Sequence, residues 1–305
     1  MNPDVARTDD GEADGTIDID VDVEKFERDG YLIFRQAYTP EQVMEWRALV
    51  DATPPRSGDL LSQDCFAHFV LDPTILHIAR KLLDEQPTYF GFSSISRGGS
   101  PGTVNWHRDN ADRLDVEGPD WSGPYSLIRF GIYMQDHKHH SGGLIMRPGS
   151  HLSQNFKSSE LVYADTMPGD LAVWNMRILH AGEGWRSIAD PEKAMDIPEA
   201  NAADPATLLD QPPGKRYAMF VSYGRNDAHT QRYIDYLSTR TFMVNIWKQS
   251  VPSDEIQASL ANHDVVFRNI WSEIKDRPNI GQHAGHVEGA HLPNHPNGIE
   301  QPASH

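Results

Sequence analysis

The sequence predicts a mainly β protein with flanking helices, in which two sheets close into a jelly-roll or cupin-like barrel. Three observations support this fold class. Segments of strand-like apolar and aromatic residues are separated by turn residues, as at residues 98–102. His107 and Asp109 are two positions apart, so both side chains would share one face of a strand. His180 ends another apolar run, residues 171–180, and a closed or two-sheet barrel easily brings such distant segments together.

The N-terminal part of the chain predicts a disordered segment followed by two helices. Residues 1–20 are acidic and lack aromatic side chains, so we expect them to be disordered. Thr39, Pro40 and Gln42 predict a helix start, with Thr39 as the N-cap and Gln42 at the capping-box position. The residues that follow have apolar side chains at helical spacing, which predicts core packing. Asp72, which precedes a proline, predicts the start of a second helix.

The middle of the chain predicts strands, and the C-terminal part predicts helices. Residues 89–96 and 103–109 have strand-like composition on either side of a glycine-rich turn. Residues 231–244 and 254–274 are helical in character. We therefore expect residues 21–275 to form a single domain.

Two further segments stand apart from this domain. Residues 187–214 contain five prolines and form an insertion after His180. Loops of that length are often functional, and we expect its ends near the mouth of the cavity, where it acts either as a lid or as passive surface decoration. Residues 276–305 are rich in histidine, proline and glycine and are expected to form a flexible tail rather than a metal site.

Composition excludes several classes of partner and site. The formal net charge is −17, which disfavours nucleic acids and anionic membrane surfaces because both require a basic face. No apolar run is long enough to cross a bilayer, and we expect a cytoplasmic protein. Cys65 is the single cysteine, which excludes an intrachain disulfide and a multi-thiolate metal site. The sequence does not predict whether the chain is a monomer or a homo-oligomer.

The strongest chemical signal is the set of His107, Asp109 and His180. Two imidazoles and one carboxylate on one face of an ion, with the other positions open, form the ligand set of non-haem Fe(II) oxygenases. The three-residue His-x-Asp pattern is weak by itself, because a chain with many histidines and aspartates contains it by chance. The set nevertheless makes these three residues the candidate metal ligands and catalytic residues.

Four ordered blocks make this pattern more specific: FERDGYLIFRQAYTPEQVMEWRALVD, LIRFGIYMQDHKHHSGGLIMRPGSH, GDLAVWNMRILHAG and KRYAMFVSYG. Together they resemble the phytanoyl-CoA dioxygenase (PhyH-like) family of Fe(II)- and 2-oxoglutarate-dependent oxygenases, from about Val21 to about Arg225. The resemblance implies a double-stranded β-helix and iron at His107, Asp109 and His180. It also implies 2-oxoglutarate as co-substrate and dioxygen as oxidant.

The resemblance also implies an arginine that binds the distal carboxylate of 2-oxoglutarate at the start of the last barrel strand. Arg216 matches this position, and the planar guanidinium suits a carboxylate because it binds bidentately and keeps its charge. This chain departs from the family in the long segment between His180 and Arg216, which makes Arg186 a rival. Arg216 is preferred because Arg186 is followed by loop-like residues. Thr103 and Trp174 are further candidates for contacts with 2-oxoglutarate.

The function implied is hydroxylation of an unactivated C–H bond of a small polar metabolite, with release of succinate and CO2. Desaturation, cyclisation or epimerisation with the same cofactors is the alternative within this class. A non-oxygenase metal cupin and a non-catalytic binding jelly roll are the alternatives of another class, and both would be expected to lack the arginine. The substrate itself is not predicted.

Other polar residues have more ordinary interpretations. Five arginines flank the predicted strands and, with nearby aromatic residues, could hold a polar or anionic molecule: Arg97, Arg108, Arg113, Arg129 and Arg147. Most of them individually are expected to be ordinary surface arginines. A second group, His137, His139 and His140, has the density of a metal site, but its position between two strands favours a solvated loop.

Overall fold

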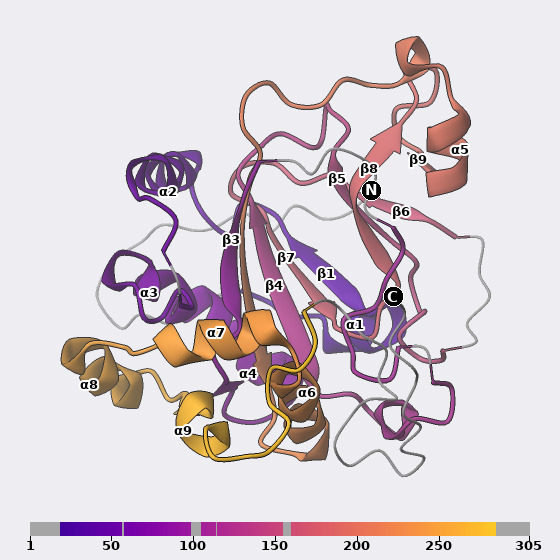
Figure 1. Ribbon diagram of the computed structural model, residues 1–305. Helices are drawn as coiled ribbons and strands as arrows, with labels where there is room; N and C mark the ends of the chain where they lie inside the picture. The colour runs from indigo at the N-terminus through magenta and orange to yellow at the C-terminus, as the bar shows by residue number, and fades with distance from the viewer. Residues whose placement is uncertain (1–18, 57, 99–104, 114, 155–159, 285–305) are drawn as a thin grey trace.

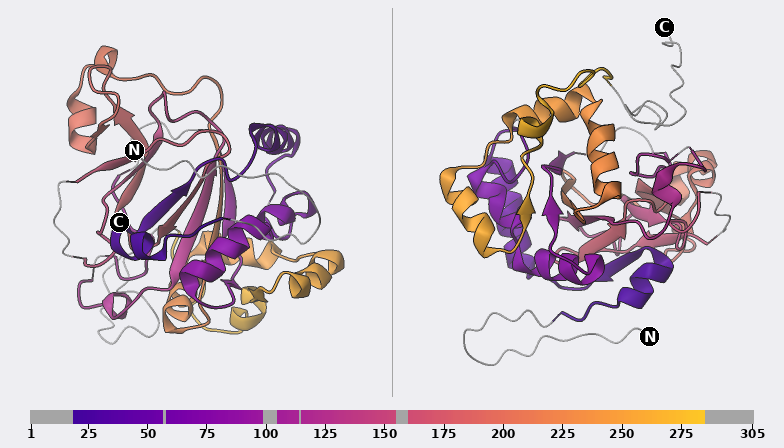
Figure 2. Two further views of the ribbon diagram at one scale, coloured as in Figure 1. Left: turned by 180° about the vertical axis from the view of Figure 1, so that it is seen from behind. Right: turned by 90° about the horizontal axis from the view of Figure 1, so that it is seen from below.

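The computed structural model describes residues 19–56, 58–98, 105–113, 115–154 and 160–284 (Figure 1). The fold is a double-stranded β-helix with flanking helices, as predicted. Two sheets lie face to face, helices cover the outer face of the larger sheet, and a short helix lies beside the smaller one (Figures 1 and 2). The expected disorder of residues 1–20 falls almost entirely outside the described residues, as does the tail beyond residue 284.

The large sheet has β4 at its centre, paired antiparallel with β7 and β10. β7 pairs in turn with β1, and β10 pairs with β2 and β3, while β11 joins β2 in parallel. The strands are, along the chain, β1 (Tyr31–Phe34), β2 (Thr88–Tyr89), β3 (Ser93–Arg97), β4 (Leu127–Tyr133), β7 (Leu171–Asn175), β10 (Tyr217–Gly224) and β11 (Val266–Phe267).

The small sheet has the order β6-β5-β8-β9, all antiparallel. These strands are β5 (Gly143–Met146), β6 (Val162–Ala164), β8 (His180–Arg186) and β9 (Ala194–Met195). His107 pairs with His180 as an isolated antiparallel bridge, so the segment around His107 extends this sheet beside β8. The chain thereby places the first and last candidate metal ligands on neighbouring strands.

Alternation along the strands separates the outer face of the large sheet from its inner face. Ile128, Phe130 and Ile132 of β4 pack into the cluster that includes the N-terminal helices. Tyr133 of β4 and Trp174 of β7 belong to a different cluster, which also contains residues of β5 and β6 from the small sheet. Since side chains alternate along a strand, odd-numbered residues of β4 and even-numbered residues of β7 and β10 face the small sheet.

The N-terminal helices begin where the sequence predicts them. Thr39 and Gln42 form a capping box at the start of α2 (Pro40–Ala52), and the side chain of Asp72 caps α4 (Pro73–Leu83). These caps satisfy backbone amides that the first helical turn leaves without partners. α1 (Val23–Asp29) and α3 (Asp64–Val70) complete this group, which packs on the outer face of the large sheet (Figure 1).

The C-terminal region contains more helices than predicted. Two long helical segments were expected, but the structure has α6 (Ala228–Ser238), α7 (Thr241–Gln249), α8 (Asp254–Asn262) and α9 (Ile270–Ile274). The breaks occur at Thr239–Arg240 and at a turn before β11, where tertiary pairing overrides helical composition. α6, α7 and α9 pack together against Leu127, at the end of the sheet where β4 begins.

Two predicted strands also differ from the observed ones. The strand expected over residues 89–96 is interrupted at Gly91, whose φ of 72° ends β2 before β3 begins. The run 171–180 is not one strand, because β7 ends at Asn175 and a turn follows it. His180 therefore begins β8 instead of ending an earlier strand. Of residues 103–109, the first two lie outside the described residues.

The insertion, residues 187–214, is an ordered addition to the small sheet. It contains β9, α5 (Ile197–Ala202) and the short 3-10 helix η2 (Pro205–Thr207). Ala194 and Ile197 are buried against Ile145 on the outer face of the small sheet. β8 extends six residues, roughly 20 Å, from His180 before the insertion starts, so that end of the insertion does not adjoin the metal centre. The expectation that both ends lie near the mouth of the cavity stays a prediction.

This position predicts that the insertion stabilises the fold more than it closes the site. Replacing residues 190–206 by a short Gly-Ser linker should lower the free energy of unfolding by about 2–4 kcal/mol, because Ile197 and two buried alanines lose their packing. A short linker suffices because Ser187 and Leu208 form a β-bridge. Urea titration measures the effect. Unchanged stability together with a raised substrate KM and lower coupling of 2-oxoglutarate consumption to product would support the lid instead.

No helix among the described residues has the length and apolar character needed to cross a membrane.

Candidate metal centre

His107, Asp109 and His180 come together on the inner side of the small sheet. His107 and His180 exchange backbone hydrogen bonds of 3.0 Å in both directions, and the amide of Asp109 donates to the carbonyl of Met176 at 2.9 Å. These bonds align the His-x-Asp segment with the turn before β8. One ligand atom of each side chain lies within 4.8 Å of the others. Among the described residues, no other group of histidine, cysteine and acidic side chains meets that criterion.

The two imidazoles are oriented by the same kind of contact. Nδ1 of His107 lies 2.9 Å from the carbonyl of Asn105, and Nδ1 of His180 lies 3.0 Å from the carbonyl of Ile178. A carbonyl accepts only from a protonated nitrogen, so Nδ1 carries the hydrogen in the neutral ring and Nε2 keeps its lone pair. Both Nε2 atoms lie 3.8 Å from the Asp109 carboxylate. Each ring therefore presents the nitrogen that a metal requires.

The electrostatics favour the protonation states of metal ligands. Burial by itself would raise the pKa of Asp109, but Arg129, His180 and His107 lower it to about 2. Burial lowers the pKa of His180 to about 4, and the neighbouring His107 contributes in the same direction. At neutral pH the site consequently holds a carboxylate and a neutral imidazole at His180, the forms that bind metal ions.

The donor set fits iron(II). Two imidazole nitrogens and one carboxylate match the facial arrangement that non-haem Fe(II) sites use, and the absence of thiolates fits an ion of intermediate softness. The rings are fixed by carbonyl contacts behind them, as ligating histidines usually are.

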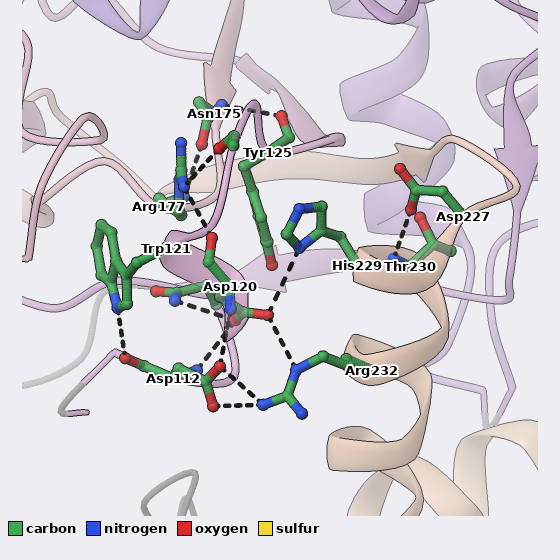
Figure 3. A network of polar contacts seen from close by, with 12 residues as sticks. Asp112, Asp120, Trp121, Tyr125, Asn175, Arg177, Asp227, His229, Thr230 and Arg232 are labelled. Carbon is green, nitrogen blue, oxygen red and sulfur yellow. Dashed lines mark hydrogen bonds and ion pairs between the residues drawn. The ribbon is translucent and has the colours of Figure 1, made fainter. Parts of the chain in front are cut away.

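A buried polar network holds the chain that follows Asp109 (Figure 3). The amides of Asp112 and Asp120 each donate to the other's carboxylate at 3.0 Å, and Asn110 donates to Asp120 at 3.1 Å. Arg232 of α6 binds both oxygens of Asp112 at 2.6 and 2.7 Å. Arg177, from the turn before His180, donates to the carbonyl of Asp120 at 2.7 Å. The network thereby connects α6 to the segment after Asp109 and to the turn before His180.

Two buried carboxylates this close require compensation. Burial and the charge of Asp120 raise the pKa of Asp112. Burial acts on Asp120 in the same direction, but His229, whose Nδ1 lies 3.9 Å from Oδ1 of Asp120, and the nearby charge of Arg232 lower its pKa overall. None of Asn110, Asp112, Asp120, Arg177 and Arg232 was predicted as a site residue. Two Asp residues in a loop give no local signal, because their partner Arg232 is more than a hundred residues away.

Arg216 precedes β10 and shares its inner face with Ala218 and Phe220, because side chains alternate along the strand. Its guanidinium carbon lies 5.9 Å from the centre of the Tyr133 ring, and its Nε is buried without a hydrogen-bond partner. Burial raises the pKa of Tyr133 to about 12, while Arg216 and Arg129 act in the opposite direction. Arg216 is thus an inward-facing cation with an unused donor.

Aromatic rings connect Arg216 with the metal centre. The Tyr133 ring lies 5.9 Å from Phe220, Phe220 lies 6.2 Å from Trp174, and Trp174 lies 5.8 Å from His180, measured between ring centroids. Trp174, a predicted cofactor contact, is buried, and its indole nitrogen has no hydrogen-bond partner. Thr103, the other predicted contact, lies outside the described residues.

Arg186 has a different environment. It is buried at the end of β8, and its guanidinium donates to the carbonyls of Pro191, His137, Lys138 and His140 at 2.7 to 3.0 Å. It also lies 4.2 Å from the centre of the Tyr163 ring. These contacts use the terminal nitrogens that a carboxylate would need, so the structure favours Arg216 over Arg186 for that task.

The five flanking arginines separate into different environments. Arg97 donates to carbonyls at the end of α2, and Arg108 donates to carbonyls near the metal centre. Arg147 pairs with Asp196 of the insertion, and Arg113 lies 5.7 Å from the Tyr236 ring. Arg129 alone among them is shown in contact with a candidate metal ligand, Asp109.

The histidine cluster after β4 is only partly the expected solvated loop. His139 is exposed and lies 2.7 Å from Asp136, but His137 is completely buried, with its backbone amide bonded to Thr166. Burial, with the positive charge of Arg216, lowers the pKa of His137 to about 3. The expectation is wrong for this residue because its amide pairs with the segment after β6, at Thr166, and its ring packs 5.5 Å from the Tyr133 ring.

Buried histidines predict that the metal-free protein is sensitive to acid. Burial lowers the pKa of His137 to about 3 and the pKa values of His151 and His180 to about 4. In the unfolded chain these three histidines titrate near 6.5. As the pH falls from about 6.5 towards 4, they therefore take up protons in the unfolded chain but not in the folded one. The free energy of unfolding should fall by up to about 1.4 kcal/mol per pH unit for each histidine.

Urea titrations from pH 7 to 4.5 in the presence of a chelator measure this dependence. His137→Asn should reduce the slope by about one proton. An unchanged slope in His137→Asn would contradict the assignment of that proton to His137.

A cavity of about 460 Å³ lies elsewhere, between the loop at Gly58, β3 and α7. None of the three candidate ligands lines it. The candidate site is therefore identified by its metal-binding side chains and not by the position of this cavity.

Comparison with known proteins agrees with the resemblance seen in the sequence. Residues 51–190 match the family model described as phytanoyl-CoA dioxygenase (PhyH). This range is narrower than the expected span of about 21–225: it includes all three candidate ligands and ends before Arg216. No curated protein sequence matches the chain.

Several solved structures are similar at low identity. HygX from Streptomyces hygroscopicus, with nickel and 2-oxoglutarate bound, has a TM-score of 0.48 and 16% identity over 66% of this chain and 84% of that chain. EctD from S. alaskensis has a TM-score of 0.48 and 16% identity over 70% of this chain and 79% of that chain. The 2-oxoglutarate-dependent epimerase SnoN from nogalamycin biosynthesis has a TM-score of 0.44 and 15% identity, with 66% and 81% covered.

Proposed function

We propose that the chain, whose residues 51–190 match the phytanoyl-CoA dioxygenase (PhyH) family model, is an Fe(II)- and 2-oxoglutarate-dependent oxygenase that hydroxylates an unactivated C–H bond of a small polar metabolite. The observation that carries the proposal is the meeting of His107, Asp109 and His180 in a segment that matches the family. The cofactors are Fe(II), 2-oxoglutarate and dioxygen. Iron and 2-oxoglutarate supply the oxidation, in which one oxygen atom of O2 enters the alcohol and the other enters succinate, with release of CO2.

The proposal gives each residue of the site a physical task. Nε2 of His107, Nε2 of His180 and one carboxylate oxygen of Asp109 hold the metal, because these atoms face one another and their protonation states are suitable. Arg216 binds the distal carboxylate of 2-oxoglutarate with its unused donors. Trp174 and Phe220 lie between Arg216 and the metal ligands and would keep water away from bound 2-oxoglutarate. Exclusion of water strengthens the ionic contacts of 2-oxoglutarate with Arg216 and with the metal.

We place the substrate next to Asp109, beside the aromatic and cationic side chains that surround Arg129. The Phe92 and Tyr233 ring centroids are 5.9 Å apart, and Arg129 lies 4.8 Å from the Phe92 ring. Such a wall suits a small molecule with both apolar and polar parts. This surface is what supports a polar metabolite as the substrate class.

Product analysis separates the proposal from its alternatives. Purified protein with Fe(II), ascorbate and 2-oxoglutarate would be screened for succinate formation against amino acids, nucleosides, sugars and acyl thioesters. Hydroxylation adds one oxygen atom to the substrate, derived from ¹⁸O2, whereas desaturation or cyclisation removes two hydrogens and epimerisation leaves the mass unchanged. Product that has lost two hydrogens, or that lacks label from ¹⁸O2, would reject hydroxylation.

The alternatives of another class make a different prediction. A non-oxygenase metal cupin or a binding jelly roll needs no 2-oxoglutarate, so the metal-loaded protein should not bind it. The family match favours the oxygenase. Titration of the Fe(II) protein with 2-oxoglutarate under nitrogen tests this directly, since absence of binding would reject the proposed function.

A further inference from the structure

Arg129 is the charged residue of β4 (LIRFGIY), the strand at the centre of the large sheet. It lies on β4, paired with Trp174 on one side and Ser222 on the other, and it shares the inner face with Gly131 and Tyr133. Only 17% of its side chain is exposed. A cation at such a position costs desolvation energy, so it needs a partner on the inner side of the barrel.

The guanidinium of Arg129 is held in one place by two aromatic rings. Its central carbon lies 4.8 Å from the centre of the Phe92 ring and 5.0 Å from the centre of the Phe220 ring. Rings on both sides restrict the planar group to a narrow range of orientations and attract its charge. Arg129 is consequently a fixed donor, unlike a flexible surface arginine.

The partner of this fixed donor is the carboxylate of the metal centre. Nη1 of Arg129 lies 3.3 Å from Oδ2 of Asp109. The other carboxylate oxygen, Oδ1, lies 3.8 Å from Nε2 of His107. Oδ2 also lies 3.8 Å from Nε2 of His180, so each oxygen of Asp109 has one histidine nitrogen at the same distance. The two oxygens differ because only Oδ2 is in contact with Arg129.

This inequality matters for the number of open metal positions. Six positions surround an octahedral ion. A carboxylate that binds through one oxygen leaves three of them open beside two histidines, whereas a chelating carboxylate leaves two. The proposed function would need three, because 2-oxoglutarate would take two through its carboxylate and keto oxygens and dioxygen would take one.

We infer that Arg129 is a positioning residue that holds Oδ2 of Asp109 and so restricts this carboxylate to one metal bond, through Oδ1. The inference rests on the proposed function, because the third open position has a role only when a bidentate co-substrate and dioxygen both bind. Arg129 acts through Asp109 and does not itself touch the reacting atoms.

The test compares two affinities under nitrogen. Arg129→Met keeps a similar unbranched stem between the two rings but removes every donor, while Arg129→Gln keeps an N–H donor without the charge. For each protein, Fe(II) affinity is measured first, and 2-oxoglutarate affinity is then measured on the Fe(II)-loaded protein from the charge-transfer absorption of the chelate. Near-infrared magnetic circular dichroism reports the coordination number of the iron.

On the Fe(II)-loaded protein, Arg129→Met should weaken 2-oxoglutarate binding by about 10- to 100-fold, and Fe(II) binding itself should fall by a smaller factor, because loss of the contact behind Asp109 affects both but only the co-substrate needs the third open position. Arg129→Gln should recover part of the loss. Arg97→Met is the matched control, because it removes a half-buried guanidinium that donates to carbonyls on the opposite side of the same sheet. That variant should bind both Fe(II) and 2-oxoglutarate like the parent protein.

Each outcome has a distinct meaning. If Arg129→Met binds 2-oxoglutarate with parental affinity and parental absorption, the inference is wrong while the proposed function stands. If Fe(II) and 2-oxoglutarate affinities fall together, Arg129 has only a structural role, and the inference is also wrong. If the parent protein binds Fe(II) but not 2-oxoglutarate, the proposed function itself fails.

Discussion

Alanine at His107, Asp109 or His180 should abolish both iron binding and turnover. Each change removes one of only three protein ligands, whereas loss of a contact behind a ligand already costs about 10- to 100-fold in metal affinity. The expected loss of Fe(II) affinity is therefore larger than 100-fold, and succinate formation should fall below detection. Equilibrium dialysis against Fe(II) under nitrogen and a succinate assay measure the two effects.

Folding must be separated from metal binding in this experiment. His107 has 38% of its side chain exposed, so His107→Ala should keep the stability of the metal-free parent. His180 is buried, and His180→Gln provides a second variant that fills the space without an imidazole. His139→Ala, at an exposed histidine beside Asp136, is the control and should keep both iron and activity. Full iron occupancy in the variants of His107, Asp109 and His180 would show that these residues are not the metal ligands.

Arg216→Ala should raise the apparent KM for 2-oxoglutarate far more than Arg186→Ala does. Loss of one partner of a buried charge-assisted pair costs on the order of 2–5 kcal/mol, or tens to thousands of times in affinity. Arg216 has a buried donor without a partner beside Tyr133, whereas Arg186 already donates to four carbonyls. Initial rates at varied 2-oxoglutarate concentration distinguish the two variants.

Arg186→Ala has its own expected result, which serves as the comparison. Removal of Arg186 takes a donor from four carbonyls, and of these His140 keeps the Tyr163 hydroxyl while Pro191, His137 and Lys138 lose the donor shown for them, so stability should fall while the KM for 2-oxoglutarate stays near the parental value. Arg216→Lys should recover part of the affinity, because it keeps the charge but loses the bidentate geometry. A larger KM effect in Arg186→Ala would transfer the carboxylate-binding role to Arg186.

The local sequence was sufficient for features that depend on neighbouring residues. The capping box of Thr39 and Gln42 and the cap of Asp72 follow from side chains that bond amides three residues away, and the structure contains both. The barrel class and the grouping of His107, Asp109 and His180 also followed, because strand periodicity and the ligand set are visible in the sequence. A signal for Arg129 was present as well, since it interrupts an apolar strand at an inner-face position.

Tertiary structure decided whatever depends on the other side of a contact. Strands and turns distant in the sequence bury His137 and fix the position of the insertion. They also determine that Arg129 contacts Oδ2 of Asp109. Arg232 binds Asp112 across 120 residues, and the sequence around either residue does not predict its partner. The physical reason is that caps and periodicity are local properties of the backbone, whereas burial and charge pairing arise only when the two sheets and α6 close on one another.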